Sequence, residues 1–147
     1  MIHFTILCVG KLKEDYMKKA VADYALRLTK YAKVDIIEVP ESDIPGEGDA
    51  LLKKIGPNET VIAMDLHGKM IDSPALASWI DGRMTSGESH FTFVIGGSDG
   101  IDSRICSVSD LRLCLSPMTF THQMTRLIIL EQIYRAMKIN NGEKYHK

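Results

Sequence analysis

The sequence concentrates its potential chemistry in the run Gly96-Gly97-Ser98-Asp99-Gly100, which directly follows the apolar segment Phe91–Ile95. Adjacent glycines permit backbone conformations and close approaches that a side chain would prevent. The run also matches G-x-S-x-G, the turn that presents a serine nucleophile in α/β-hydrolases. Asp110 and either His122 or His146 could complete a Ser, Asp, His order. That fold needs a much longer chain and an upstream glycine-rich loop for its oxyanion hole, so the sequence disfavours a serine hydrolase.

Other cofactor signatures are missing from the sequence. No G-x-x-x-x-G-K-[ST] run is present and no G-x-G-x-x-G follows the first expected strand, so neither a nucleoside triphosphate nor NAD is indicated. The cysteines Cys8, Cys106 and Cys114 form no C-x-x-C pair. We therefore expect three buried, reduced thiols, no metal site, and a cytoplasmic location.

Arg126 is the second unusual residue. At about 100° per residue it falls in line with Leu130, Ile133 and Met137 on the apolar stripe of the longest helical pattern. An unpaired buried charge costs several kcal/mol. Arg126 is therefore expected either to reach water from the first helical turn or to face an anionic ligand or a subunit interface.

Composition limits the class of protein. The 147 residues are 45% hydrophobic and 25% charged, which is typical of one globular domain. The formal net charge of -1 excludes a protein that coats nucleic acid by charge alone, although both ends of the chain are basic and the middle is acidic. No apolar run approaches the roughly 20 residues of a membrane span. The N-terminal segment resembles a strand and not a signal peptide.

The elements that must position these residues alternate along the chain. We expect strands over Ile2–Val9, Val34–Val39, Thr60–Asp65, Phe91–Ile95 and Leu111–Leu115, and helices over Glu14–Tyr31, Ala50–Ile55, Ser73–Met84, Asp102–Val108 and His122–Lys138. Residues 41–49 are expected to form an exposed loop, and residues 67–69 a turn. This alternation predicts an α/β domain with a mostly parallel sheet and helices on both faces. Ligands bind beyond the carboxyl ends of such strands.

Five segments of the chain together resemble the RlmH family: Ile6–Lys13, Phe93–Gly100, Leu115–Arg126, Glu131–Ala136 and Tyr145–Lys147. That family comprises small SPOUT-class methyltransferases that use S-adenosylmethionine to modify N3 of a pseudouridine in the helix 69 loop of bacterial 23S ribosomal RNA. The resemblance implies a single methyltransferase domain over residues 1–147. It also implies a C-terminal trefoil knot, a homodimer, and assembled ribosomes as the partner.

The resemblance places cofactor contacts at the end of the third strand, in the glycine run and in the loop after the last strand. These residues are Met64, Gly96, Leu115, Ser116, Pro117, Met118, Thr119 and Phe120. A bulky side chain at Gly96 is expected to block this pocket.

A uracil-type N3–H is a weak acid, so a base or a cation near it would help the reaction. The candidates are Arg126, Arg135, Tyr145 and His146, and the sequence leaves the choice among them open. The tail from Tyr145 is expected to complete the active site of its own chain or of a partner. The wide apolar arc of the last helix indicates either a central buried helix or half of a dimer interface. We predict a dimer, which Ile129→Asp should disrupt. The alternative is a non-catalytic RNA- or ribosome-binding domain of the same fold.

Overall fold

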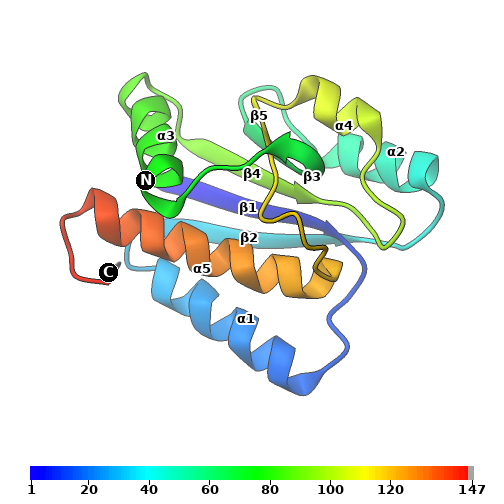
Figure 1. Cartoon of the computed structure of the whole chain (residues 1–147), viewed down its shortest axis with the longest axis horizontal. Coiled ribbons are helices and arrows are strands. Elements are labelled where there is room, and N and C mark those ends of the chain that lie inside the picture. Colours follow the sequence, from blue (N-terminus) through cyan, green and yellow to red (C-terminus); the bar gives the residue numbers. More distant parts are fainter. Residues whose placement is uncertain (146–147) are drawn as a thin grey trace.

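The computed structural model describes residues 1–145, which form one α/β domain (Figure 1). In chain order its elements are β1 (Ile2–Val9), α1 (Asp15–Leu28), β2 (Ala32–Val39), α2 (Ile44–Lys54), β3 (Thr60–Lys69), α3 (Ser73–Thr85), β4 (His90–Ile95), α4 (Ser103–Val108), β5 (Leu111–Leu113) and α5 (His122–Asn140). The five strands follow the order β2-β1-β4-β3-β5 and every pair is parallel. The predicted fold class is confirmed. Among the described helices, none has the length and apolar character needed to cross a membrane.

Side-chain alternation along the strands divides the core into two layers. In β1, Phe4 and Ile6 pack with buried residues of α1, α3 and α5, whereas Leu7 and Val9 pack with Leu51 of α2 and with α4. Successive strand residues point to opposite faces, so a strand buried on both faces is apolar throughout. Helices therefore cover both faces of the sheet, as Figure 1 shows.

Helix α2 begins inside the segment that was expected to be a loop. The Asp43 side chain caps it by accepting a hydrogen bond from the Gly46 amide at 2.8 Å. Pro45 lies in the first turn, where its missing amide proton costs nothing, and Glu47 lies where the helix dipole favours a negative charge. The proline and the glycines that indicated a loop instead mark a helix start. Only the residues before the cap are irregular.

Strand β3 is longer than the sequence predicts because it contains a bulge. Leu113 of β5 lies opposite both Met64 and Lys69, so the four residues between these two leave the ladder and β3 then resumes. Gly68 lies against the neighbouring backbone, where an added Cβ would come within 2.7 Å of the Arg112 carbonyl. The expected turn at residues 67–69 is therefore wrong, and close backbone packing explains the glycine.

A polar cluster occupies the amino ends of the strands. His3 and His90 face each other in register, and their rings stack with centroids 4.0 Å apart. His3 Nε2 lies 2.6 Å from the Asp35 carboxylate, and Thr5 Oγ1 lies 2.8 Å from His90 Nε2. Burial lowers the pKa of His90, the nearby His3 lowers it further, and the charge of Glu59 opposes the shift.

Protonation of His90 should make the fold less stable in acid. Its pKa is lower in the folded chain than the usual value of about 6.5, so the native state takes up this proton at a lower pH than the unfolded chain does. The contribution of His90 to the free energy of unfolding is complete above about pH 6.5 and is lost as the pH falls. We expect His90→Gln to show a shallower loss of stability than the wild type between about pH 7 and pH 5.5 in urea denaturation.

The charged residues around His90 are left unchanged in both proteins of that comparison. They are His3, Lys33, Asp35 and Glu59. His67→Gln, which changes an exposed histidine in the β3 bulge, is the matched control and should keep the wild-type slope. Parallel pH profiles for wild type and His90→Gln would contradict the prediction.

Candidate functional site

The parallel sheet brings the candidate cofactor residues to one edge. Met64 ends the regular part of β3, Gly96 directly follows β4, and the loop of residues 115–120 follows β5. Because the carboxyl ends of parallel strands meet at the same edge, all three segments lie on the side where ligands bind in such sheets (Figure 1). β5 ends at Leu113, so Leu115 belongs to the loop and not to the strand.

The glycine run forms a tight turn that closes on itself. The Gly100 amide donates to the Gly97 carbonyl at 3.1 Å, and Gly100 has a φ of +111°. A Cβ on Gly96 would lie 2.7 Å from the Gly100 carbonyl oxygen and 2.8 Å from the Ile101 Cα. Gly96 is therefore required by the turn itself. A bulky residue there would distort the backbone whether or not a ligand binds, so it cannot serve as a clean test of a pocket.

Among residues 1–145, which leave out the candidate His146, the side chains do not form the arrangement of the hydrolase alternative. Within this range, Ser98 has no hydrogen bond to a histidine. The Asp110 carboxylate instead accepts the Val61 amide at 2.8 Å, and His122 lies 3.7 Å from Glu41. The G-x-S-x-G match is coincidental in this fold.

The loop after β5 exposes apolar side chains at this edge. Its backbone is held by the Met118 amide, which donates to Ser116 Oγ at 3.0 Å, and by the Cys114 thiol, which donates to the Ser116 carbonyl. Met118 is 75% exposed and Phe120 is 38% exposed. Exposed apolar groups on a fixed loop, together with free backbone donors and acceptors, suit an aromatic base such as adenine.

Arg126 pairs within its own chain, an arrangement that the sequence does not predict. Its side chain is 1% exposed, and its guanidinium donates to the Glu38 carboxylate at 2.6 Å and to the Gly10 carbonyl at 3.0 Å. It therefore neither reaches water nor requires an external anion. Nε of Arg126 is buried without a hydrogen-bond partner among the described residues. Glu38 could have been noticed, because strand alternation puts it on the same face as the apolar Ile36.

Arg135 and Tyr145 lie together at the other end of α5. Arg135 pairs with Glu131 at 2.9 Å, and its guanidinium lies 4.8 Å from the centre of the Tyr145 ring. That ring also contacts the edge of Tyr134 at 5.0 Å, and its hydroxyl lies 3.3 Å from the hydroxyl of Tyr24. Burial raises the pKa of Tyr145 to about 12, so this phenol stays protonated at neutral pH. The candidate His146 lies outside the described residues.

In a single chain, the cofactor loop and the catalytic candidates Arg135 and Tyr145 lie toward opposite ends of α5. α5 contains 19 residues and is therefore about 28 Å long. Arg126 and the cofactor loop lie at its first turns, whereas Arg135 and Tyr145 lie near and beyond its end (Figure 1). Within a single chain the tail up to Tyr145 and the cofactor loop do not meet.

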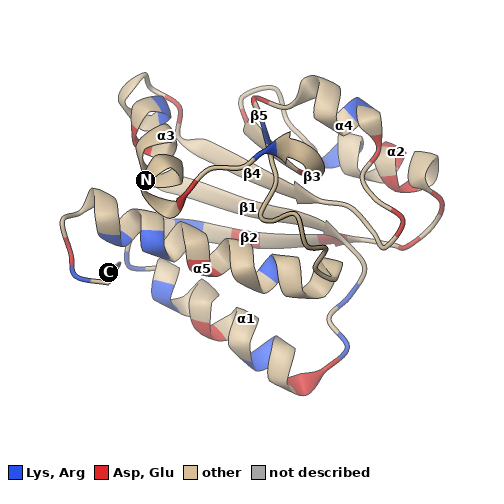
Figure 2. Ribbon diagram, viewed as in Figure 1, with Lys and Arg blue, Asp and Glu red and all other residues tan. Residues whose placement is uncertain are grey.

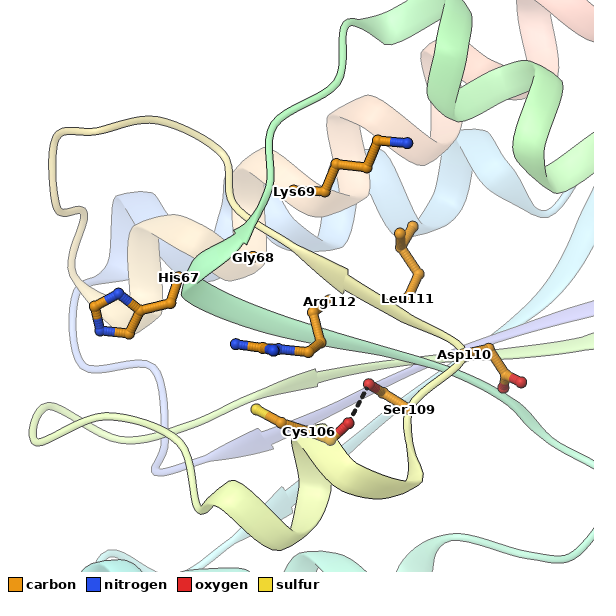
Figure 3. Close-up of a pocket in the computed structure, with 8 residues that line it drawn as sticks. All are labelled: His67, Gly68, Lys69, Cys106, Ser109, Asp110, Leu111 and Arg112. Carbon is orange, nitrogen blue, oxygen red and sulfur yellow. Dashed lines mark hydrogen bonds between the residues drawn. The ribbon is translucent and has the colours of Figure 1, made fainter.

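A polar pocket of about 360 Å³ lies between the β3 bulge, β5 and the end of α4 (Figure 3). It is lined by His67, Gly68, Lys69, Cys106, Ser109, Asp110, Leu111 and Arg112. Arg112 donates to Asp65 at 2.7 Å, and burial followed by the Asp65 charge raises the pKa of the Cys106 thiol. This thiol is partly exposed, unlike the expected buried cysteine, but it is not an activated nucleophile. The pocket contains neither Gly96 nor the loop of residues 115–120, so we assign it no cofactor.

The ion pair between the buried Arg126 and the partly exposed Glu38 yields a stability prediction. Arg126→Met leaves the Glu38 carboxylate and the Gly10 carbonyl without their donor, and we expect the free energy of unfolding to fall by about 2–4 kcal/mol. Glu38 is partly exposed and can be hydrated, which keeps the loss below that of a fully buried pair. Urea denaturation measures the change. Asp23→Asn, which breaks the exposed pair with Arg27, is the control and should have no measurable effect. Wild-type stability of Arg126→Met would contradict the assignment.

Comparisons with known proteins agree with this geometry. The family model described as "Predicted SPOUT methyltransferase" matches residues 2–146. A solved structure described as that of a probable methylase family protein from Haemophilus influenzae Rd KW20 aligns over 98% of this chain and 70% of its own, with a TM-score of 0.58. Its sequence identity of 11% makes it evidence for the fold alone. On the family match, this chain belongs to the SPOUT methyltransferase family.

Proposed function

We propose that this protein uses S-adenosylmethionine to methylate N3 of a pseudouridine in the helix 69 loop of 23S ribosomal RNA, on assembled ribosomes. Family membership supports a methyltransferase. The observation that carries the cofactor assignment is the closed glycine turn after β4 at the same edge as the exposed apolar loop of residues 115–120. The RNA target rests on the resemblance of the sequence motifs to the RlmH family.

The cofactor would supply a methyl group that is already electrophilic. The residues of the chain then have to align donor and acceptor, and alignment accounts for a large part of such rate enhancements. The turn that starts at Gly96 would lie beside the methionine and ribose parts, and the backbone of residues 115–120 provides donors and acceptors for adenine.

The target must lose its N3 proton as the new N–C bond forms. Tyr145 is protonated at neutral pH and can donate a hydrogen bond but cannot accept this proton. Arg135 offers a positive charge that stabilises the developing anion. His146, with an unperturbed pKa of about 6.5, is the candidate that could take the proton.

The proposal requires a second copy of the chain. The length of α5 keeps Tyr145 away from the cofactor loop of its own chain, so we propose a homodimer in which one tail completes the site of the other. The trefoil knot implied by the resemblance is part of the same proposal. Ile129 is fully buried in the core of a single chain, so Ile129→Asp would unfold the protein and does not report on an interface. Leu127 and Ile128 remain partly exposed on α5 and are better positions for that test.

The net charge favours a structured target over a free oligonucleotide. A formal charge of -1 gives little attraction to RNA in general, so recognition has to depend on a pre-folded particle. Figure 2 shows where Lys and Arg lie on α1, on α5 and in the segment after β1, the regions that could provide a local patch.

Methyl transfer to purified ribosomes tests the proposal directly. Protein and radiolabelled S-adenosylmethionine are incubated with ribosomes that lack the modification, and we expect one N3-methylpseudouridine in the helix 69 loop. A short helix 69 hairpin should be a much poorer substrate. RNA binding without cofactor binding would instead support the non-catalytic alternative, and equal methylation of the hairpin would contradict recognition of an assembled particle.

Removing only residues 146 and 147 tests the tail. Tyr145 is packed against Tyr24, Tyr134 and Arg135, so a deletion that includes it would also remove these contacts. We expect the shorter deletion to lower turnover at least about tenfold, about 1.4 kcal/mol of activation free energy, with unchanged folding and cofactor affinity. Lys144→Ala, an exposed neighbour, is the control.

Two results would contradict the role of the tail. One is full turnover by the deletion variant. The other is a wild-type protein that light scattering shows to be monomeric at micromolar concentration, because a single chain holds Tyr145 away from its own cofactor loop.

A further inference from the structure

Glu47 is a buried carboxylate without a counter-ion. It lies in the first turn of α2 and is 6% exposed. One oxygen, Oε2, accepts the Ser42 amide at 3.0 Å, but no donor among the described residues bonds to Oε1 and none of their cations pairs with the carboxylate. The positive end of the α2 dipole offsets part of the cost of burying this charge. Oε1 is not among the buried atoms that lack a partner, so it is open to a further donor such as water or a cationic group.

The carboxylate of Glu47 lies directly on the glycine turn. Its two oxygens are 2.8 and 2.9 Å from the position that a Cβ of Gly97 would occupy. The next residue of α2, Gly48, packs against the N-cap of α4, because an added Cβ would overlap the Asp102 carboxylate. These two contacts hold α2 against the segment that runs from Gly97 to Asp102. The Glu47 carboxylate therefore lies beside the turn that belongs to the candidate cofactor site.

The surroundings of Glu47 are acidic. The nearby cation Arg104 is already committed, since its guanidinium pairs with Asp49 and Asp102 at 2.8 Å each. Further carboxylates are exposed in the same region at Glu41, Asp43 and Asp99. Figure 2 shows acidic residues on α2 and in the segments beside it. Such a potential repels an RNA backbone and attracts a cationic small molecule.

We propose that Glu47 binds the primary ammonium group of the methionine part of S-adenosylmethionine. The inference rests on the proposed function and identifies a residue that no motif of the sequence singled out. An ammonium group has three N–H donors and can satisfy Oε1, whereas the sulfonium of the same cofactor has none. The carboxylate thereby selects for the amino-acid end of the ligand, while the apolar loop of residues 115–120 serves the adenine.

Three adenosyl ligands separate this role from a structural one. Isothermal titration calorimetry compares wild type and Glu47→Gln with S-adenosylmethionine, S-adenosylhomocysteine and 5′-methylthioadenosine. The first two carry the ammonium group and the third lacks the whole amino-acid part. We expect Glu47→Gln to bind the first two at least about tenfold more weakly and to bind 5′-methylthioadenosine within about twofold of wild type. Asp49→Asn, an exposed acid on the same helix, is the control and should bind all three as wild type does.

Every other outcome overturns the inference. Equal weakening for all three ligands, with a lower melting temperature, would make Glu47 a purely structural residue. Weakening for S-adenosylmethionine alone would mean that it faces the sulfonium, and unchanged affinities would mean that it faces no ligand. If wild type binds none of the three, the proposed function itself fails and this inference fails with it.

Discussion

The ion pair that the buried Arg126 forms with Glu38 is the constraint on which the candidate site depends. Through it, and through the bond to Gly10, the start of α5 is fixed to the carboxyl ends of β1 and β2. The loop of residues 115–120 is then held at both ends, by β5 before it and by α5 after it. Because both ends of this loop are fixed, the loop cannot fold down onto the sheet. Its apolar side chains therefore stay at the surface. Positioning of α5 is thus the contribution of Arg126 in the described chain.

Helices from opposite faces of the sheet converge on this edge. α5 approaches from the layer that it shares with α1 and α3, and α2 approaches from the layer that it shares with α4. Between them lies the turn that starts at Gly96, with no room for a side chain at Gly96 or Gly97. The closed turn therefore requires glycine at position 96, and the adjacent Glu47 carboxylate requires it at position 97. A ligand bound here would contact the backbone more than side chains.

The two edges of the sheet differ in charge and in role. The carboxyl edge combines an apolar loop with unpaired negative charge, which suits a cationic nucleoside. The amino edge carries the stacked pair His3 and His90, and the end of α5 carries Arg135 with Tyr145. Because α5 spans the distance between these edges, a reaction that needs both must combine two chains. Symmetry of a two-fold dimer would then produce two equivalent sites.

The sequence by itself determined the α/β alternation, the strand Ile2–Val9 and the start of α5, because periodicity and helix caps are local signals. The sequence also singled out the glycine run after β4, and the resemblance added the residues of the loop after β5. Only the tertiary structure decided the partner of Arg126, which is 88 residues away in the sequence, and the contact of Glu47 with the glycine turn. It also decided the bulge in β3 and the separation of the tail from the cofactor loop. Contacts between distant segments leave no periodic trace along the chain, so their geometry becomes visible only when the sheet brings those segments together.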